Sequence, residues 1–536
     1  MTRMPDAGGE PLDAIIVGAG CGGLYMLHRL REAGFSARVI EAGSSVGGTW
    51  YWNRYPGARC DIESMEYSYS FSPELEREWR WTERYASQSE ILRYLEHVAD
   101  RFDLKRDILF DTRVTRAQWD EGQARWQVTT DAGATMASRF CIMATGNLSA
   151  PKLPDWPGLE RFVGPVLHTA AWPEKAPDLD GKRIGVVGTG SSGIQAIPQL
   201  ARMAKCLTVF QRTPSFAVPA NNRLLTEEQQ ATVCARYGEL REGARNSFLG
   251  FFDSVRPDSA LADTPKRRQE VFEEMWAAGS TGLLRAYGDL LVDADANATA
   301  AEFARGKIAE LVHDPATAKA MTPTGYPIGA RRLCAEIGYF DAMNRDNVEL
   351  VDLRETPVSE VTADGIETFA GRYPLDVLVF ATGFSAVTGA LAAIDIVGRG
   401  GRTLKEEWED GPRTYLGLMV AGFPNLFLVT GPGSPSVLSN VVLSIEQHVG
   451  WIGDCLEALV ARDATTIEAS QEAEDAWVDH ADAVAQTTLF PRANTWYQGR
   501  TRDGRQVFMP YVGGVGPYRD KCRAVVTAGY EGFLID

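Results

Sequence analysis

A short apolar stretch that runs into a glycine-rich turn occurs twice in this 536-residue chain, and no other feature constrains its fold as strongly. In the first copy, Asp13–Val17 precedes a G-x-G-x-x-G turn, and a predicted helix, Leu24–Glu32, and a predicted strand, Ala37–Ile40, follow it. The fixed glycines are Gly18, Gly20 and Gly23. A buried parallel strand, a turn of this kind and a helix open a Rossmann-like unit. We therefore predict an α/β protein with two such units.

The spacing of these glycines indicates a dinucleotide site. Gly18 permits the tight turn, Gly20 lets a pyrophosphate approach the backbone, and Gly23 lets the helix pack closely on the strand. The N-terminus of the helix then faces the phosphates. Glu41 follows the second strand, 21 residues after Gly20, where a carboxylate accepts hydrogen bonds from ribose hydroxyls.

The second copy lacks an acid at the corresponding place. Arg183–Val187 runs into the turn, and the strand Leu207–Phe210 is followed by Gln211, Arg212 and Thr213. The glycines here are Gly188, Gly190 and Gly193. A guanidinium and a hydroxyl bind a 2′-phosphate, which a carboxylate would repel. The first site therefore favours an unmodified ribose and the second favours NADPH, which together predict a flavoprotein that uses FAD and NADPH.

The order of segments predicts how the two units are assembled. Phe140–Gly146 and Val377–Gly383 share an Ala-Thr-Gly ending, which is typical of the strand that leaves such a domain. Between them lies charged, helix-favouring sequence with a capping box at Thr226 and an N-cap followed by proline at Thr264. We predict FAD-binding segments at 1–148 and 385–536, NADPH-binding segments at 149–220 and 326–384, and a helical insertion in the NADPH-binding domain at 221–325.

Composition excludes several classes of partner. The formal charge of −17 argues against nucleic acid, and the longest nearly apolar run, Leu416–Val429, is too short and too interrupted to cross a bilayer. The eight cysteines form no C-x-x-C pair and the six histidines have no metal-ligand spacing, so we expect reduced thiols and no metal. The polar start has no secretory pattern. We expect a cytoplasmic monomer or weak oligomer that acts on a small molecule.

Two other chemistries do not match the motifs. A disulfide reductase needs a redox C-x4-C pair near the first unit, and Cys60 has no such neighbour. A G-x-S-x-G pattern at Gly43–Gly47 is typical of serine hydrolases, but it merges with the glycine turn after Glu41. Monooxygenation is the flavin chemistry that remains.

A stretch between the two glycine turns carries the pattern F-x-G-x3-H-x3-W-P, with Phe162, Gly164, His168, Trp172 and Pro173 at its fixed positions. With this fingerprint the chain resembles the type I Baeyer–Villiger monooxygenases, and most closely the phenylacetone and steroid monooxygenases. The loops Gly47–Ser64, Gly411–Gly417 and Gly431–Asn440 are also similar to that group. The resemblance spans Val17–Phe533. It implies an FAD enzyme that uses NADPH and O2 to oxidise ketones to esters or lactones through a flavin C4a-peroxide.

The resemblance also implies the contacts of each cofactor. For FAD these are Thr49, Trp50, Tyr51, Trp52, Asp61, Tyr67 and Val441. For NADP they are Thr189, Gly190, Ser191, Ser192, Gly193, Ile194, Gln195, Arg212, Thr213, Arg331 and Trp496.

The catalytic arginine of the family corresponds to Arg332, and its partner carboxylate to Asp61. A guanidinium keeps its proton and stabilises the negative charge that develops on the peroxide and on the ketone adduct. By the same resemblance, Ser436, Val437 and Leu438 line the substrate pocket. The ketone remains open among aromatic, steroid-like and cyclic classes. Two other functions also remain: an N- or S-oxygenating flavin monooxygenase, and an NADPH oxidase that oxygenates no substrate.

Overall fold

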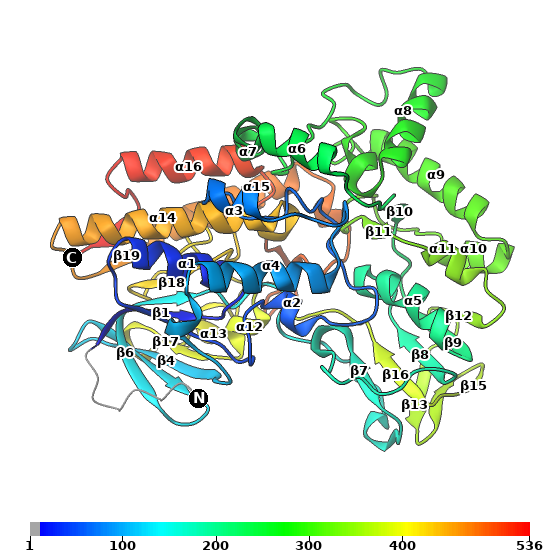
Figure 1. Ribbon diagram of the computed structural model, residues 1–536, viewed down its shortest axis with the longest axis horizontal. Coiled ribbons are helices and arrows are strands. Elements are labelled where there is room, and N and C mark those ends of the chain that lie inside the picture. Colours follow the sequence, from blue (N-terminus) through cyan, green and yellow to red (C-terminus); the bar gives the residue numbers. More distant parts are fainter. Residues whose placement is uncertain (1–10) are drawn as a thin grey trace.

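The computed structural model describes residues 11–536 and places the two glycine-turn units in separate β-sheets (Figure 1). The first sheet has eight strands, seven of them in the order β17-β4-β5-β6-β1-β2-β3, with β18 also paired to β6. Its strands are β1 (Leu12–Val17), β2 (Ala37–Ile40), β3 (Ile108–Leu109), β4 (Val114–Asp120), β5 (Arg125–Thr130), β6 (Thr135–Met143), β17 (Asp395–Val397) and β18 (Leu426–Leu428). Strands β6, β1, β2 and β3 run parallel, whereas β4, β5 and β6 are antiparallel.

The second sheet has five parallel strands in the order β12-β9-β8-β16-β7. They are β7 (Val166–His168), β8 (Arg183–Val187), β9 (Cys206–Gln211), β12 (Val348–Asp352) and β16 (Val377–Phe380). In Figure 1 this sheet lies at the lower right and the first sheet at the lower left. The predicted α/β class with two Rossmann-like units is confirmed.

The chain leaves the first sheet after β6 and returns to it only at β17. The second sheet is completed in between, by strands on both sides of the helical region. The two units therefore meet along segments that cross between them, and the site described below lies at such a crossing. The division into five numbered segments stays a prediction.

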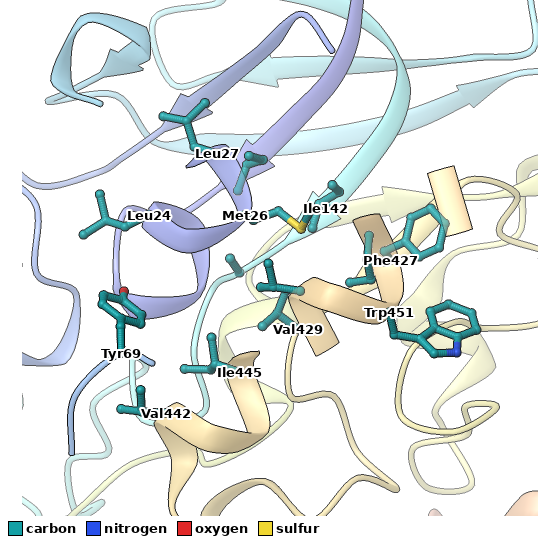
Figure 2. Close-up of a cluster of buried hydrophobic side chains, with 14 of the residues drawn as sticks. Leu24, Met26, Leu27, Tyr69, Ile142, Phe427, Val429, Val442, Ile445 and Trp451 are labelled. Carbon is teal, nitrogen blue, oxygen red and sulfur yellow. The ribbon is translucent and has the colours of Figure 1, made fainter. Parts of the chain in front are cut away.

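Helix α1 (Cys21–Glu32) lies against α14 (Val441–Ala461), and both cover the first sheet. Figure 2 shows the apolar side chains that they enclose, among them Leu24 and Leu27 of α1, Ile142 of β6 and Ile445 of α14. These four side chains are at most 7% exposed. Burying side chains of this size contributes about 1.5–3 kcal/mol each, so this core fixes the glycine turn on the sheet.

The helical region between the two parts of the second sheet contacts both units. Its helices are α6 (Glu227–Ala235), α7 (Tyr237–Asn246), α8 (Pro265–Ala278), α9 (Ala294–Leu311) and α10 (Pro315–Met321). Both predicted caps are present, since Thr226 forms a capping box with Gln229 and Thr264 accepts from the amide of Arg267. From α7, the buried Arg241 donates to the carbonyl oxygen of Glu66 at 3.0 Å, on the FAD side. Helices α8 and α9 share a core with Phe216 of the second unit.

The remaining elements include α5, which follows the second glycine turn and packs in the core of its unit, and several shorter helices and strands. The helices are α2 (Thr49–Trp52), α3 (Pro73–Glu78), α4 (Gln88–Arg101), α5 (Ser191–Met203), α11 (Tyr339–Met343), α12 (Gly389–Ala392), α13 (Leu404–Glu407), α15 (Gln471–Gln486) and α16 (Val515–Thr527). The strands are β10 (Ala217–Pro219), β11 (Cys334–Glu336), β13 (Val358–Thr362), β14 (Gly365–Thr368), β15 (Gly371–Pro374), β19 (Ile467–Ala469), β20 (Gln498–Arg500), β21 (Gln506–Phe508) and β22 (Phe533–Ile535).

All eight cysteines are unpaired, as predicted, and five of them are buried. Within residues 11–536, no helix has the length and apolar character needed to cross a bilayer. The same residues contain no cluster of three or more acidic, histidine or cysteine side chains suited to a metal ion.

Candidate active site

The first glycine turn has the geometry that the sequence predicts. Gly18 adopts φ +102°, and a Cβ on it would lie 2.7 Å from the carbonyl oxygen of Ala144. A Cβ on Gly23 would lie 1.8 Å from the carbonyl oxygen of Gly18, so only glycine fits there. Gly20 is the N-cap of α1 and brings no side chain to cover the first-turn amides. These amides are donors for a pyrophosphate, which fits FAD at this turn.

Glu41 lies directly after β2 and is only 5% exposed. Its Oε2 accepts from the amide of Ala19 at 2.6 Å and its Oε1 from the amide of Gly43 at 2.7 Å. Burial raises the pKa of this carboxyl, although the backbone donors act in the opposite direction. The acid thus lies beside the glycine turn, where the sequence predicts the acceptor for ribose hydroxyls.

The second glycine turn repeats this backbone in the other sheet. Gly188 adopts φ +109°, and a Cβ on Gly193 would lie 2.1 Å from the carbonyl oxygen of Gly188. The position of Glu41 is taken by Gln211, which is fully buried and accepts from the hydroxyl of Thr189 at 3.1 Å. Arg212 follows it and is exposed. A neutral amide and a cation replace the acid here.

Arg331 provides a second cation close to Arg212. Its guanidinium lies 4.8 Å from the centre of the Tyr326 ring and donates to the carbonyl oxygen of Asn494. Its buried Nε has no partner among the described residues. Burial lowers the pKa of Arg331, and the charge of Arg212 lowers it further. Two mutually repelling cations and an unpaired donor fit a phosphate, and hence the 2′-phosphate of NADPH.

The predicted flavin contacts come from the short helix α2 and from segments that pack on it. Trp50 Nε1 donates to the hydroxyl of Tyr67 at 3.1 Å, and the two rings meet edge to face. The hydroxyl of Tyr51 lies 2.8 Å from Ser44 Oγ. Val441 begins α14, whose N-cap, Asn440, also donates to the carbonyl oxygen of Glu66 at 2.9 Å. The structure thus anchors these residues around the first glycine turn, while their contacts with FAD stay predictions.

Arg332 and Asp61 form a bidentate ion pair, although they lie 271 positions apart in the chain. Arg332 Nε lies 2.5 Å from Asp61 Oδ2, and Nη2 lies 2.7 Å from Oδ1. The remaining terminal nitrogen, Nη1, donates to the carbonyl oxygen of Val437 at 2.9 Å. Behind the pair, Ser280 Oγ donates to the backbone oxygen of Asp61 at 2.7 Å. A guanidinium with this many partners is held in one orientation.

The electrostatics of this pair keep both groups charged. Burial disfavours the charge on Asp61, but the adjacent Arg332 outweighs it and holds the pKa of the carboxyl below its usual range. Burial likewise disfavours the charge on Arg332, and Asp61 outweighs it and raises the pKa of the guanidinium. The site therefore contains a permanent, oriented cation.

Gln195 connects the two units beside this pair. Tyr55, from the loop after α2, donates its hydroxyl to Gln195 Oε1 at 2.7 Å, and Gln195 Nε2 donates to the carbonyl oxygen of Arg59 at 3.0 Å. Gly57 adopts φ +88°, and a Cβ on it would lie 2.3 Å from the carbonyl oxygen of Gln195. Sequence reasoning missed Tyr55 and Ser280, and the Tyr-Pro-Gly at 55–57 is the one local signal of such a tight contact.

The fingerprint residues hold the segment that crosses between the units. His168 Nδ1 accepts from the amide of Ala170 at 3.0 Å, and its Nε2 lies 3.3 Å from Thr382 Oγ1 in the second Ala-Thr-Gly turn. Burial lowers the pKa of His168. The amide of Trp172 donates to the carbonyl oxygen of Trp52 in α2 at 3.2 Å. A Cβ on Gly164 would lie 2.2 Å from the carbonyl oxygen of Asp376.

The predicted substrate loop lies against Arg332 and an apolar cluster. Ser436 adopts φ +44° and accepts from Asn147 Nδ2. Val437 and Leu438 pack in one cluster with Trp496 and Tyr497, whose ring centres are 4.2 Å apart. The cluster also contains Leu291, Val484, Ala485, Phe490, Phe508 and Val512. The cation thus lies at the edge of an apolar wall.

Comparison with known proteins identifies the family. The model of the pyridine nucleotide-disulphide oxidoreductases matches residues 15–225, which contain both glycine turns. The NADP-bound structure of oxidized steroid monooxygenase is 52% identical, covers 98% of this chain and 99% of its own, and has a TM-score of 0.94. A Baeyer–Villiger monooxygenase from Pseudooceanicola batsensis is 41% identical over 98% of this chain and 97% of its own length. This chain belongs to the Baeyer–Villiger monooxygenase family.

A third relative shows the chemical range of similar chains. The phenazine N-monooxygenase of Lysobacter antibioticus is 42% identical over 98% of this chain and 97% of its own length. The members of this family are flavoproteins, and the present chain is an FAD- and NADPH-dependent Baeyer–Villiger monooxygenase. The match to disulphide oxidoreductases reflects the nucleotide-binding units, because Cys60 is an unpaired buried thiol.

Proposed function

We propose that this enzyme oxidises ketones that carry an aromatic, steroid-like or cyclic group, and that Arg332 and Asp61 are its catalytic pair. The observation that carries the proposal is that three hydrogen bonds fix Arg332, two to the carboxylate oxygens of Asp61 and one to the carbonyl oxygen of Val437. Such a guanidinium is a preorganised donor for negative charge that develops on oxygen. When bound, reduced FAD supplies the activated oxygen that enters the substrate.

Each residue of the pair has a distinct part in this proposal. Arg332 faces the developing negative charge and stays protonated, because a guanidinium does not lose its proton under these conditions. Asp61 orients it and offsets its charge, so that a buried cation is tolerated before the anion forms. The nucleotide-side residues Arg212 and Arg331 bind the 2′-phosphate of NADPH.

The apolar cluster beside Arg332 supports the choice of ketone. Val437 and Leu438 of the substrate loop pack with Phe490 and Tyr497, so aliphatic and aromatic side chains gather beside the loop that holds Arg332. A ring attached to the carbonyl carbon would bury its apolar surface there, which contributes about 25 cal/mol per Å2. The ketone carbonyl would then point out of this apolar surface toward the guanidinium, which Asp61 and the carbonyl oxygen of Val437 already hold. The monomeric or weakly oligomeric state and the cytoplasmic location stay predictions.

Replacing the arginine tests this proposal. In Arg332→Ala we expect FAD to stay bound and NADPH to reduce it, while ester formation falls about 100- to 1,000-fold, the usual cost of removing a preorganised donor. Purified enzyme would be supplied with NADPH, oxygen and a panel of arylketones, steroid ketones and cycloalkanones, with products identified by mass spectrometry. Arg202→Ala, which alters an exposed arginine on α5, is the control.

Two results would contradict the assignment. Undiminished ester formation by Arg332→Ala would remove Arg332 from the reaction. An N-oxide from an aromatic nitrogen heterocycle, formed equally well by both proteins, would favour the N-oxygenation named for the phenazine relative, since that reaction develops no charged carbonyl adduct.

A further inference from the structure

Several buried residues that are not glycine have a left-handed backbone on the FAD side of the active site, and side-chain hydrogen bonds link three of them. Leu416, Thr430 and Ser436 have φ values of +58°, +56° and +44°, and each is at most 3% exposed. Such a conformation costs roughly 1–3 kcal/mol at each residue and persists only where neighbouring groups impose it. The hydrogen bonds around these three residues therefore identify what imposes it.

His448 of α14 and Tyr518 of α16 connect the first two of these residues. The hydroxyl of Tyr518 donates to the carbonyl oxygen of Leu416 at 2.5 Å and lies 2.8 Å from His448 Nε2. His448 Nδ1 accepts from the backbone amide of Thr430 at 3.0 Å. Both side chains are fully buried. These contacts join two helices of the carboxyl-terminal third to the strand end that leads into the substrate loop.

The protonation of the ring follows from its partners. Nδ1 accepts a hydrogen bond and so carries no proton, and the single hydroxyl proton of Tyr518 is used on Leu416. Nε2–H therefore donates to the Tyr518 oxygen, and the imidazole is neutral. Burial lowers the pKa of His448 to about 3, in agreement with this tautomer. The donors and acceptors thus form an uninterrupted chain from Thr430 to Leu416.

The chain continues from Thr430 to the catalytic guanidinium. Asn147 Nδ2 lies 3.3 Å from Thr430 Oγ1 and also donates to Ser436 Oγ. The next residue, Val437, supplies the carbonyl oxygen that accepts from Arg332 Nη1 at 2.9 Å. The backbone of this loop is also held by Ser439, whose Oγ donates to the carbonyl oxygen of Ser436 at 3.0 Å.

We propose that His448 and Tyr518 are positioning residues, which act through Thr430 and Asn147 to fix the loop carbonyl that orients Arg332. This inference rests on the proposed role of Arg332. The two residues touch neither substrate nor the reacting atoms. They restrict the motion of the strained loop, because each left-handed residue forms a hydrogen bond with a buried group whose own position is fixed.

The test compares the yield of ester for each NADPH oxidised, with the remainder measured as hydrogen peroxide. In Tyr518→Phe and in His448→Asn, which keeps an acceptor for Thr430 but loses the link to Tyr518, we expect this yield to fall about 3- to 10-fold. His448→Phe removes both links and should lower it further. FAD content and rate of flavin reduction should stay near those of the unmodified enzyme.

Two comparisons separate positioning from simple core packing. Tyr530→Phe removes a hydroxyl from another buried tyrosine of the same carboxyl-terminal region and should leave the yield unchanged. If the chain transmits the effect, Asn147→Ala combined with Tyr518→Phe should be no worse than Asn147→Ala alone. The inference would be overturned if the double variant lost the product of the two single losses in yield. It would also be overturned if Tyr518→Phe gave the same yield as Tyr530→Phe.

The same assays distinguish failure of the inference from failure of the proposed function. If the unmodified enzyme forms no ester from any ketone, the proposed function fails and the inference fails with it. If it forms ester and only the variants behave as Tyr530→Phe does, the proposed function stands and the inference alone is wrong. A loss of FAD from Tyr518→Phe in proportion to the loss of yield would also overturn it, because the residue would then support cofactor binding.

Discussion

The two glycine turns share one backbone conformation but differ in the side chain at the end of each second strand. Gly18 and Gly188 have φ values of +102° and +109°, and in each turn the third glycine leaves no space for a Cβ. At the end of that strand the first unit has Glu41, which accepts from two backbone amides, and the second has Gln211, which accepts from a hydroxyl. The shared geometry suits a pyrophosphate in general, and we propose that the charge at this one place selects the dinucleotide.

Their surroundings differ as well. In the first turn the closest group to a Cβ on Gly20 would be Gly48, at 3.5 Å, so a later loop of the same unit covers the turn. A Cβ on Gly190 would meet nothing within 4 Å. A covered turn suits a cofactor that remains bound, and an open turn suits one that enters and leaves in each catalytic cycle.

The largest effect should come from removing the third glycine of each turn. A Cβ in Gly23→Ala would lie 1.8 Å from a backbone oxygen, so we expect a colourless protein without FAD. The corresponding contact in Gly193→Ala is 2.1 Å, and here we expect a yellow protein whose KM for NADPH rises more than about tenfold, equivalent to at least 1.4 kcal/mol. Absorbance at the flavin bands and steady-state kinetics measure both. Equal loss of FAD in the two variants would contradict the separation of the sites.

Replacing the acid of the first unit should have the next largest effect. Glu41→Gln keeps the shape but loses the charge that the amides of Ala19 and Gly43 face. Hydrogen bonds to charged groups contribute about 1.5–3 kcal/mol, so FAD affinity should fall about 10- to 100-fold, while KM for NADPH is unchanged. Titration of the apoprotein with FAD checks this. An affinity equal to that of the unmodified protein would mean that the charge does not select the cofactor.

A smaller effect is expected at the second unit. Arg212→Ala should raise KM for NADPH about 5- to 20-fold and leave KM for NADH unchanged, because an exposed charge-assisted contact contributes about 1–2 kcal/mol. Arg202→Ala is again the matched control. If KM for both nucleotides rose together, Arg212 would not recognise the 2′-phosphate.

The smallest effect concerns stability and pH on the FAD side. Burial raises the pKa of Glu66 to about 8 from a usual 4.5. Between these values the folded protein keeps a proton that the unfolded chain releases, so this residue makes stability fall as pH rises. In Glu66→Gln the melting temperature should therefore fall less across this range than in the unmodified enzyme. Glu302→Gln, at an exposed position on α9, is the control, and parallel curves for all three proteins would contradict the assignment.

Local patterns predicted much of the fold. The strands β2 and β8 have the predicted bounds, and α1 begins earlier than predicted, at Cys21, because two glycines of the turn lie within the helix. The caps at Thr226 and Thr264 depend only on residues a few positions away, and both are present. The insertion was predicted as part of the NADPH-binding domain, yet Arg241 of α7 is buried against the FAD side, which no local pattern indicates.

The sequence by itself determined the two Rossmann-like units and their order, and it predicted the cofactor that each favours, because these depend on residues close together along the chain. It also indicated Arg332 and Asp61 through family resemblance. Only the tertiary structure decided that both carboxylate oxygens of Asp61 and the carbonyl oxygen of Val437 hold Arg332, and that His448 and Tyr518 support that loop. Those contacts join residues 70 to 271 positions apart, so they arise from tertiary packing, both between the units and between α14 and α16, and leave no periodic or local trace in the chain.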